Sequence, residues 1–311
     1  MSTIITGGTG FVGRHLAKKL KENANIFGKI INVSRTGKQA SCFDKSYKID
    51  LGTQENSTFG MLKFVLDKHK PDYIFHLASK ATVKMDGLDA FNILNDNILS
   101  TQKICEWSPK GCKVVLASTV IVYGDWIFSD DSKDEYDELD RTEPTSIYGM
   151  TKRASESILR YHTSTGKIKG VSARMCATVG SGLTHGVVYD FIRKIKENPV
   201  LEAIGSYPGS TKPYMHIDDL TTALTLLALK QDISGEYNLV PDDKINIEQV
   251  GKAVMKGLGT EKEIKWLGEA ANWSGDNRLI AVSNKKLKSI GWKPKYNSSE
   301  AIVEAVKEMT C

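Results

Sequence analysis

The chain begins with a short β-branched segment, Ser2–Thr6, that leads directly into a glycine-rich turn and then into a segment with helical spacing. Gly7, Gly10 and Gly13 recur at every third position of this turn. Glycines at such positions let the chain turn sharply, let the backbone approach a pyrophosphate, and let the helix pack closely on the strand. The start of the helix adds unpaired N–H groups and a partial positive charge. The N-terminal segment therefore predicts a strand–turn–helix unit that can receive the pyrophosphate of a dinucleotide.

Strand-like and helix-like segments alternate through the first half of the chain. Short apolar or β-branched segments predict strands, and apolar residues at helical spacing predict helices between them. The predicted strands are Ser2–Thr6, Lys29–Ser34, Tyr47–Ile49, Tyr73–Ala78, Lys113–Ser118 and Gly170–Arg174. The predicted helices are Phe11–Glu22, Phe59–His69, Leu88–Trp107 and Ile147–His162. This alternation predicts an α/β fold with a Rossmann-type, doubly wound parallel sheet covered by helices on both faces.

The alternation loosens after about Met175, where helical segments dominate and short strands are expected near Leu201–Ile204, Glu236–Leu239 and Glu263–Leu267. We expect residues 1–175 to form a dinucleotide-binding domain, to which residues 206–232 cross back. Residues 176–205 and 233–311 are expected to form a smaller α/β C-terminal substrate lobe. A stretch with seven acidic residues in eleven, Asp130–Asp140, predicts a solvated loop, and its spacing does not fit a calcium loop.

Composition is that of an ordinary soluble globular protein, with 41% hydrophobic and 25% charged residues. A net charge of +5 is too small and dispersed to indicate a nucleic-acid partner. The five cysteines show no CxxC spacing, so they predict free thiols in a reducing compartment and no metal site. No apolar segment approaches the roughly 20 residues that cross a bilayer. We expect a cytoplasmic enzyme with neither a membrane nor a nucleic-acid partner.

A phenol and an ammonium follow the fifth predicted strand. Tyr148 and Lys152 are four residues apart in a predicted helix, so they share one face. A free tyrosine has a pKa of about 10, and a fixed ammonium nearby is expected to lower it so that the phenol can exchange protons. Thr119, just past an apolar strand-like segment, can orient the substrate oxygen, with Ser118 as the neighbouring alternative. The three groups predict a site that moves a proton beside a hydride-carrying cofactor.

The end of the second predicted strand bears on the choice of cofactor. A carboxylate there accepts hydrogen bonds from an adenosine ribose and selects NAD, whereas an arginine accommodates the 2′-phosphate of NADP. This chain has Ser34 followed by Arg35. The pair favours NADP if the Arg35 side chain faces the ribose. It is compatible with NAD if Arg35 stacks on adenine or faces water.

Taken together, these motifs resemble the extended short-chain dehydrogenase/reductases that act on nucleotide sugars, especially the 4-epimerases. The similarity includes the glycine turn, an Asp-Leu pair, a His-Leu-Ala-Ser segment, an Asn-x-x-x-Thr helix, the hydroxyl before Tyr-Gly, and Tyr-x-x-x-Lys. The resemblance implies that cofactor contacts come from Gly7, Gly10, Phe11, Val12, Gly13, Ser34, Arg35, Asp50, Leu51, Leu77, Ala78, Ser79, Asn97, Tyr148 and Lys152. It also implies catalysis by Thr119, Tyr148 and Lys152, and substrate contacts from Ser118, Thr119, Ala177 and Lys212.

Differences from the family pattern bear on the reaction. The dehydratase branch carries Asp-Glu directly after the catalytic threonine, and the decarboxylase branch needs a Glu there, but this chain has Val120 and Ile121. Ala177 replaces an asparagine and Lys212 an arginine on the side that binds the nucleotide diphosphate. Lysine keeps the charge but loses the bidentate fork. Trp273, where many members carry arginine, either stacks on a base or belongs to the core.

These observations lead to the hypothesis of an NAD(P)-dependent nucleotide-sugar 4-epimerase, with NAD as the cofactor and NADP possible because of Arg35. The alternative is an NADPH-dependent reductase of a 4-keto nucleotide sugar, which uses the same three catalytic residues. A cofactor-sensing protein without chemistry is a third class, and the intact Tyr–Lys–hydroxyl set argues against it. The resemblance also implies a homodimer that pairs through Leu88–Trp107 and Ile147–His162.

Overall fold

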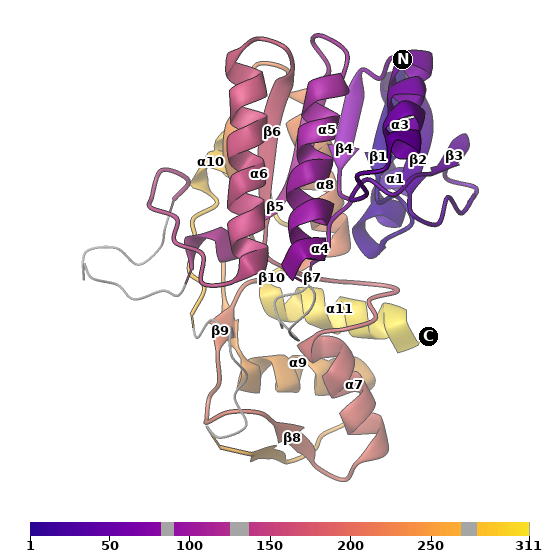
Figure 1. Cartoon of the computed structure of the whole chain (residues 1–311). Coiled ribbons are helices and arrows are strands. Elements are labelled where there is room, and N and C mark those ends of the chain that lie inside the picture. Colours follow the sequence, from indigo (N-terminus) through magenta and orange to yellow (C-terminus); the bar gives the residue numbers. More distant parts are fainter. Residues whose placement is uncertain (82–89, 125–136, 269–278, 311) are drawn as a thin grey trace. The chain divides into compact units, whose positions relative to one another are not determined.

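The computed structural model describes residues 1–81, 90–124, 137–268 and 279–310 (Figure 1). The chain forms two compact units. Unit 1 comprises Met1–Val122, Pro144–Arg174 and Thr221–Tyr237, and unit 2 comprises Tyr123–Glu143, Met175–Leu220 and Asn238–Cys311. Trp273 and part of the acidic stretch lie outside the described residues.

A seven-stranded sheet forms the centre of unit 1, in the order β11-β6-β5-β4-β1-β2-β3. The strands are β1 Ser2–Thr6, β2 Lys29–Ser34, β3 Lys45–Lys48, β4 Tyr73–His76, β5 Lys113–Thr119, β6 Lys169–Met175 and β11 Gly235–Leu239. All four pairs from β5 to β3 are parallel. The strand order turns back between β1 and β4, so the carboxyl ends of these two strands flank the switch point where such sheets bind ligands. The predicted doubly wound Rossmann-type sheet is confirmed.

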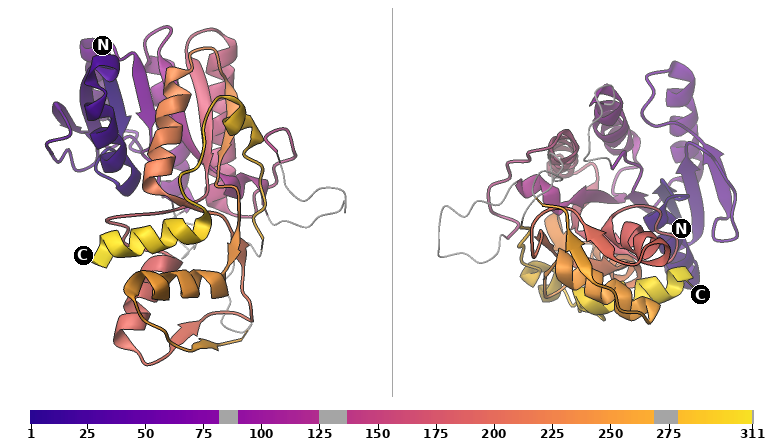
Figure 2. Two further views of the ribbon diagram at one scale, coloured as in Figure 1. Left: turned by 180° about the vertical axis from the view of Figure 1, so that it is seen from behind. Right: turned by 90° about the horizontal axis from the view of Figure 1, so that it is seen from below.

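Helices cover the sheet because its strands are apolar on both faces; every residue of β1 and β5 is buried. Figure 1 shows α5 and α6 on one face, and the view from behind in Figure 2 shows α8 on the other. The helices are α1 Phe11–Glu22, α2 Ala24–Phe27, α3 Asn56–His69, α4 Ala90–Leu94, α5 Ser100–Trp107, α6 Ile147–Ser164 and α8 Ile217–Leu229. A short 3-10 turn, η2 Val120–Tyr123, follows β5.

The predicted helix Leu88–Trp107 is three successive pieces in its described part. A π-helical turn, η1 Asn95–Leu99, separates α4 from α5. Such turns are rare and frequent at functional sites, because the extra residue turns side chains away from the regular helical face. A second difference concerns β11, which was expected in the smaller lobe. It lies next to β6 at the edge of the large sheet.

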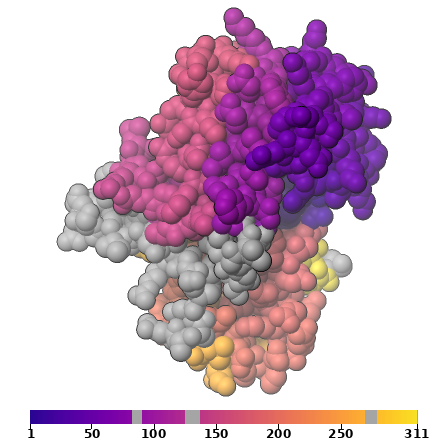
Figure 3. All heavy atoms as spheres, in the orientation of Figure 1, coloured from indigo at the N-terminus to yellow at the C-terminus, as the bar shows by residue number. Residues whose placement is uncertain are grey.

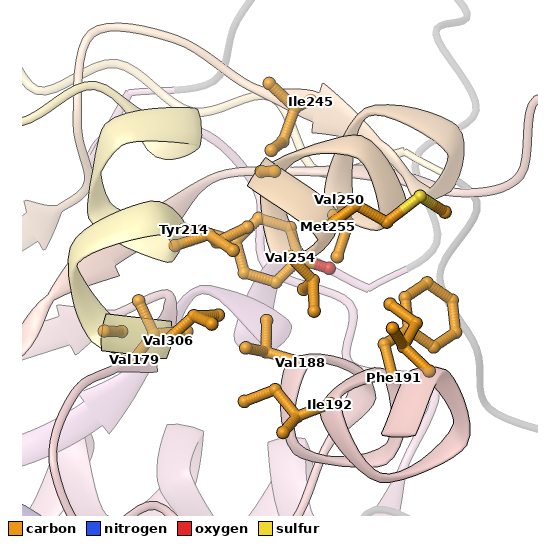
Figure 4. Packing of buried hydrophobic residues seen from close by; sticks show 14 of the residues in the cluster. Val179, Val188, Phe191, Ile192, Tyr214, Ile245, Val250, Val254, Met255 and Val306 are labelled. Atoms are coloured by element: carbon orange, nitrogen blue, oxygen red, sulfur yellow. The ribbon is translucent and has the colours of Figure 1, made fainter. Parts of the chain in front are cut away.

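Unit 2 is built from short strand pairs and helices. Its strands are β7 Ala177–Val179, β8 Leu201–Ala203, β9 Thr211–Lys212, β10 Tyr214–His216, β12 Ile245–Asn246 and β13 Ile264–Trp266. Its helices are α7 Val187–Glu197, α9 Ile247–Leu258, α10 Lys285–Ser289 and α11 Ser298–Thr310. Figure 4 shows apolar side chains from α7, α9 and α11, among them Phe191, Val254 and Val306, packed into one core. Each such buried side chain contributes about 1.5–3 kcal/mol relative to an exposed one.

Candidate functional site

The glycine turn between β1 and α1 is tightly packed. Gly7 has a positive φ of 70°, which favours glycine. A Cβ on Gly7 would lie 2.9 Å from the backbone of Ala78, and a Cβ on Gly13 would lie 2.4 Å from the carbonyl oxygen of Gly7. The N-cap residue of α1, Gly10, has no side chain, and the first turn contains no acidic residue. The first N–H groups of α1, which include those of Phe11 and Val12, therefore suit a pyrophosphate.

Replacing Gly13 with alanine tests this packing. The added Cβ forces α1 away from the turn, so we expect a loss of about 1–3 kcal/mol in the free energy of unfolding. We also expect at least a tenfold weaker affinity for dinucleotide, about 1.4 kcal/mol. Urea unfolding and NADH fluorescence titration measure the two effects. Gly60→Ala in α3 is the matched control, because nothing lies within 4 Å of its added Cβ; a comparable loss in this control would refute the steric argument.

The predicted adenosine-side residues lie at the ends of neighbouring strands. The Ser34 hydroxyl accepts hydrogen bonds from the Gly37 amide and from the Asn32 side chain, both at 3.2 Å. The carboxylate of Asp50 accepts the Gly52 amide at 3.0 Å. Lys103 Nζ donates to the carbonyl oxygen of Leu51 at 2.9 Å, which fixes this turn from α5. The turn after β2 and the turn after β3 are thus both held by side chains of unit 1.

Asn97, in the π-turn η1, joins the segment after β4 to α6. Its Oδ1 accepts hydrogen bonds from the Ser79 hydroxyl and the Lys80 amide, both at 2.9 Å, and its Nδ2 donates to Thr151 Oγ1 at 2.9 Å. The side chain is buried. Leu77 and Ala78 are held at the end of β1, because their amides donate to the carbonyl and hydroxyl oxygens of Thr6. The structure therefore brings the predicted residues 77–79 and Asn97 together.

The catalytic candidates lie at the end of β5 and in the first turns of α6. Ser146 caps α6 by accepting the Gly149 amide, which places Tyr148 at the start of the helix. The Tyr148 hydroxyl is hydrogen-bonded to Thr119. Lys152 Nζ lies 5.9 Å from the centre of the Tyr148 ring and donates to the carbonyl oxygen of Ala117 at 2.8 Å. Thr119, Tyr148 and Lys152 thus form one buried cluster in unit 1.

Burial controls the protonation of this cluster. It raises the pKa of Tyr148 to about 12, and the hydrogen bond from Thr119 acts in the opposite direction. Burial also lowers the pKa of Lys152 to about 7, against the charge of Glu156. The pKa of Tyr148 is therefore raised and not lowered as expected from the sequence, because burial penalises the phenolate more than the hydrogen bond with Thr119 favours it.

An ion pair beneath the cluster was not predicted from the sequence. Arg174 in β6 donates from Nε and Nη2 to the two carboxylate oxygens of Glu156, both at 2.9 Å. The Ser118 hydroxyl donates to Glu156 Oε1 at 2.6 Å and is fully buried. Ser118 therefore supports α6 in this structure, and Thr119 is the stronger candidate for a substrate contact. Glu156 follows Lys152 by one helical turn, which is the only signal in the sequence for its position.

His76, at the end of β4, is buried between two hydroxyls. Its Nδ1 lies 2.7 Å from Thr6 Oγ1 and its Nε2 lies 3.2 Å from Ser100 Oγ. Burial, with the nearby Lys152, lowers the pKa of His76 to about 3. The imidazole is therefore neutral in the folded protein at physiological pH, so that its two nitrogens serve as one donor and one acceptor.

This lowered pKa predicts sensitivity to acid. Between about pH 6.5 and about pH 3, His76 is protonated in the unfolded chain but stays neutral in the folded protein. The contribution of His76 to the free energy of unfolding is therefore fully present above about pH 6.5. Below that pH it falls by about 1.4 kcal/mol per pH unit. Urea unfolding from pH 7 to 4 should show a shallower pH dependence for His76→Asn than for the wild type. The exposed His185→Asn control should keep the wild-type slope; equal slopes in all three proteins would contradict the prediction.

The predicted phosphate-side residues belong to unit 2. Ala177 begins β7 opposite Tyr214 of β10, and Lys212 ends β9 opposite Ile245 of β12. Both positions are accessible. Their contact with a substrate therefore stays a prediction.

His216, Asp218 and Glu308, also in unit 2, offer ligand atoms within 4.8 Å of one another. However, His216 Nδ1 accepts the Asp218 amide at 3.3 Å, which leaves the proton of a neutral ring on Nε2. That nitrogen lies 3.4 Å from Glu308 Oε1 and makes no hydrogen bond within the described residues. The arrangement favours a polar contact between β10 and α11 over metal ligation, since a ligating nitrogen must be unprotonated.

Among the described residues, no helix is long and apolar enough to span a membrane.

Comparison with known proteins decides the family. A sequence profile described as the NAD dependent epimerase/dehydratase family matches residues 3–239. The chain belongs to this family. Membership confirms the predicted resemblance to extended short-chain dehydrogenase/reductases and identifies the chain as an enzyme of this type.

Individual relatives of this epimerase/dehydratase family member carry different names. Homo sapiens dTDP-D-glucose 4,6-dehydratase is 24% identical over 319 residues, covering 98% of this chain and 88% of that protein. Xenopus tropicalis UDP-glucuronic acid decarboxylase 1 is 25% identical over 315 residues, covering 97% and 70%. The structure of Thermus thermophilus UDP-glucose 4-epimerase in complex with NAD superposes with a TM-score of 0.84 at 23% identity, covering 99% of this chain and 98% of that chain. The structural similarity supports the fold, and the different names of the relatives leave the reaction open.

Proposed function

We propose that this chain is a nucleotide-sugar 4-epimerase that works with bound NAD. The observation that carries the proposal is the identity of the two residues that follow Thr119 in the sequence. Val120 and Ile121 follow it, and neither side chain can transfer a proton. Removing water from a sugar needs an acid and a base besides the redox tyrosine, whereas inversion at one carbon needs only one group that takes and returns a proton. The cluster of Thr119, Tyr148 and Lys152 supplies one such group.

The residues act as follows in this proposal. Bound NAD supplies a reversible acceptor for hydride. Tyr148 takes the proton of the sugar's C4 hydroxyl and later returns a proton to the same oxygen, after the keto sugar has turned its other face toward the cofactor, while Thr119 holds the reacting oxygen. Lys152 holds the nicotinamide ribose and supports the charge on Tyr148. Substrate contacts come from Ala177 and Lys212, and the UDP and dTDP names of the relatives support a nucleotide sugar as the substrate class.

The test uses the purified enzyme without added cofactor, in deuterated water, with a panel of UDP- and dTDP-hexoses. We expect a 4-epimer whose mass shows no solvent deuterium at C4, because the hydride removed from C4 returns to it. Deuterium at C4 would rule out this mechanism. Absence of any epimer across the panel would count against the proposed reaction.

A reductase of 4-keto nucleotide sugars is the second candidate, and Arg35 is the observation that favours it. A cofactor that is consumed is commonly NADPH, and Arg35 follows β2 where a 2′-phosphate would bind. Loss of NADPH absorbance in proportion to product would favour the reductase. Turnover without added NADPH would favour the epimerase.

We also propose a cytoplasmic homodimer. The outer surface of α4 and α6 carries exposed apolar side chains, namely Phe91 at 80%, Tyr161 at 65%, Met150 at 53% and Leu94 at 39% exposure. Figure 3 shows the face of unit 1 on which α5 and α6 lie at the surface. Exposed apolar groups of this size on neighbouring helices suit pairing with the same face of a second copy. The cytoplasmic location is supported by Cys42, Cys105, Cys112 and Cys176, which are free thiols.

A further inference from the structure

We propose that Asp96 makes this chain select NAD over NADP by neutralising Arg35, the side chain that would otherwise hold a 2′-phosphate. This inference rests on the proposed binding of a dinucleotide at the glycine turn. It goes beyond that proposal because it names the residue that decides which form of the dinucleotide binds.

Arg35 occupies the position where cofactor form is decided. It directly follows β2, the strand whose end meets the adenosine ribose in folds of this type. The Ser34 hydroxyl is already engaged with the Gly37 amide and Asn32, so it is turned toward its own loop. The Arg35 side chain is 64% exposed. By itself, such an arginine predicts binding of NADP.

Asp96 changes that prediction. Its Oδ2 lies 3.5 Å from Arg35 Nη1, and its side chain is only 17% exposed. A partly buried carboxylate holds its partner more firmly than an exposed one, because water screens the pair less. Arg35 is thus held near η1, and Asp96 neutralises its charge before any ligand binds.

Asp96 is held through both its side chain and its backbone. It packs against the turn after β3, where a Cβ on Gly52 would lie 2.1 Å from Asp96 Oδ1. Its own carbonyl oxygen accepts the Ser100 hydroxyl at 2.5 Å. The π-turn η1 therefore presents two consecutive polar side chains to different parts of unit 1. Asp96 reaches the turns after β2 and β3, and Asn97 reaches Ser79 and Thr151.

A 2′-phosphate brings close to two negative charges to this position. It must compete with Asp96 for Arg35, and it is also repelled by Asp96. The 2′-hydroxyl of NAD meets neither cost. Removing one like charge at this range changes phosphate affinity by about tenfold in a partly solvated site.

The experiment measures Kd for NADH and NADPH by fluorescence titration of the full-length protein. For Asp96→Asn we expect the Kd for NADPH to fall about tenfold while that for NADH changes by less than about twofold. Asp67→Asn, an exposed position on α3, removes the same charge elsewhere in unit 1 and should leave both values unchanged. Asp96→Ser is a second variant, and thermal unfolding identifies whichever variant keeps the fold.

The double variant Arg35→Gln with Asp96→Asn separates neutralisation of Arg35 from a general effect of charge. The gain in NADPH affinity should disappear without Arg35. An unchanged ratio of the two Kd values in folded Asp96 variants overturns the inference, and so does a gain that persists in the double variant. Failure of the wild type to bind either dinucleotide is a different result, since it refutes the proposed function itself.

Discussion

Tyr148→Phe is expected to lower turnover of the nucleotide sugar by about 10²–10⁴-fold. The substitution removes the hydroxyl that takes and returns the proton and leaves the ring in its place. The hydrogen bond to Thr119 is lost with it. Steady-state rates with the substrate identified from the panel give the measurement.

Cofactor affinity distinguishes lost chemistry from a damaged site. The NADH Kd of Tyr148→Phe should stay within about threefold of the wild type, because Gly7, Gly10 and Asn97 are untouched and Phe fills the same space. Tyr161→Phe is the matched control; it lies on the same helix and is 65% exposed. A Tyr148→Phe enzyme with wild-type turnover would remove Tyr148 from the proposed mechanism. It would move the search for the proton-transferring group to other buried residues.

Proton transfer at Tyr148 also has to overcome burial. With a pKa near 12, the phenol is protonated at neutral pH, so removal of a substrate proton has to proceed together with its delivery elsewhere. The Thr119 hydroxyl and the Lys152 ammonium are the two groups near enough to ease that transfer. Because the pKa of Lys152 is lowered to about 7, the protonated population of Lys152 changes within the physiological range.

Much of the sheet and the cluster of Thr119, Tyr148 and Lys152 could be predicted from the sequence, because each depends on local pattern. The strand at Ser2–Thr6 was predicted to the residue, and Tyr148 and Lys152 share a helical face as their spacing requires. The glycine turn was predictable for the same reason, since the close approach of Gly13 to Gly7 leaves no room for a side chain.

What could not be predicted depends on contacts between distant segments. In the π-turn at Asn95–Leu99, Asn97 accepts a hydrogen bond from the Lys80 amide and donates one to Thr151, which no periodicity within the helix reports. The edge position of β11 depends on its pairing with β6, a strand that is far away in the sequence. The partner of Glu156 is on β6, and helical spacing alone cannot find a residue on a strand.

Glu156→Gln is expected to destabilise the protein by about 3–5 kcal/mol, because it removes the charged acceptor that the buried Arg174 guanidinium holds with two hydrogen bonds. The side chains of both residues are almost completely buried, at 0% and 2% exposure. A glutamine offers one acceptor atom in place of the two carboxylate oxygens, so its NH2 group faces one of the two Arg174 donors. Chemical unfolding measures the loss, with Glu22→Gln, an exposed glutamate at the end of α1, as the control.

Replacing both residues distinguishes the net contribution of the ion pair to stability from the cost of removing only one of its two buried charges. Glu156→Leu combined with Arg174→Met should recover most of the stability, since an apolar pair of similar volume removes both buried charges. A double variant that is as unstable as Glu156→Gln would instead assign the loss to packing around α6. Leucine at position 156 gives the Ser118 hydroxyl no acceptor, which accounts for about 1–3 kcal/mol of stability that the double variant does not recover.

Glu156 also has an effect that a purely structural residue would lack. Its charge opposes the lowering of the Lys152 pKa by burial. Without it, Lys152 loses its proton at a lower pH, so the alkaline limb of the pH–rate profile should move toward acid in Glu156→Gln. A profile that keeps its shape while stability falls would confine Glu156 to holding α6 on β6. A profile that shifts would show that this ion pair also keeps the ammonium beside Tyr148 charged, which links the stability of the α6–β6 contact to the chemistry at its surface.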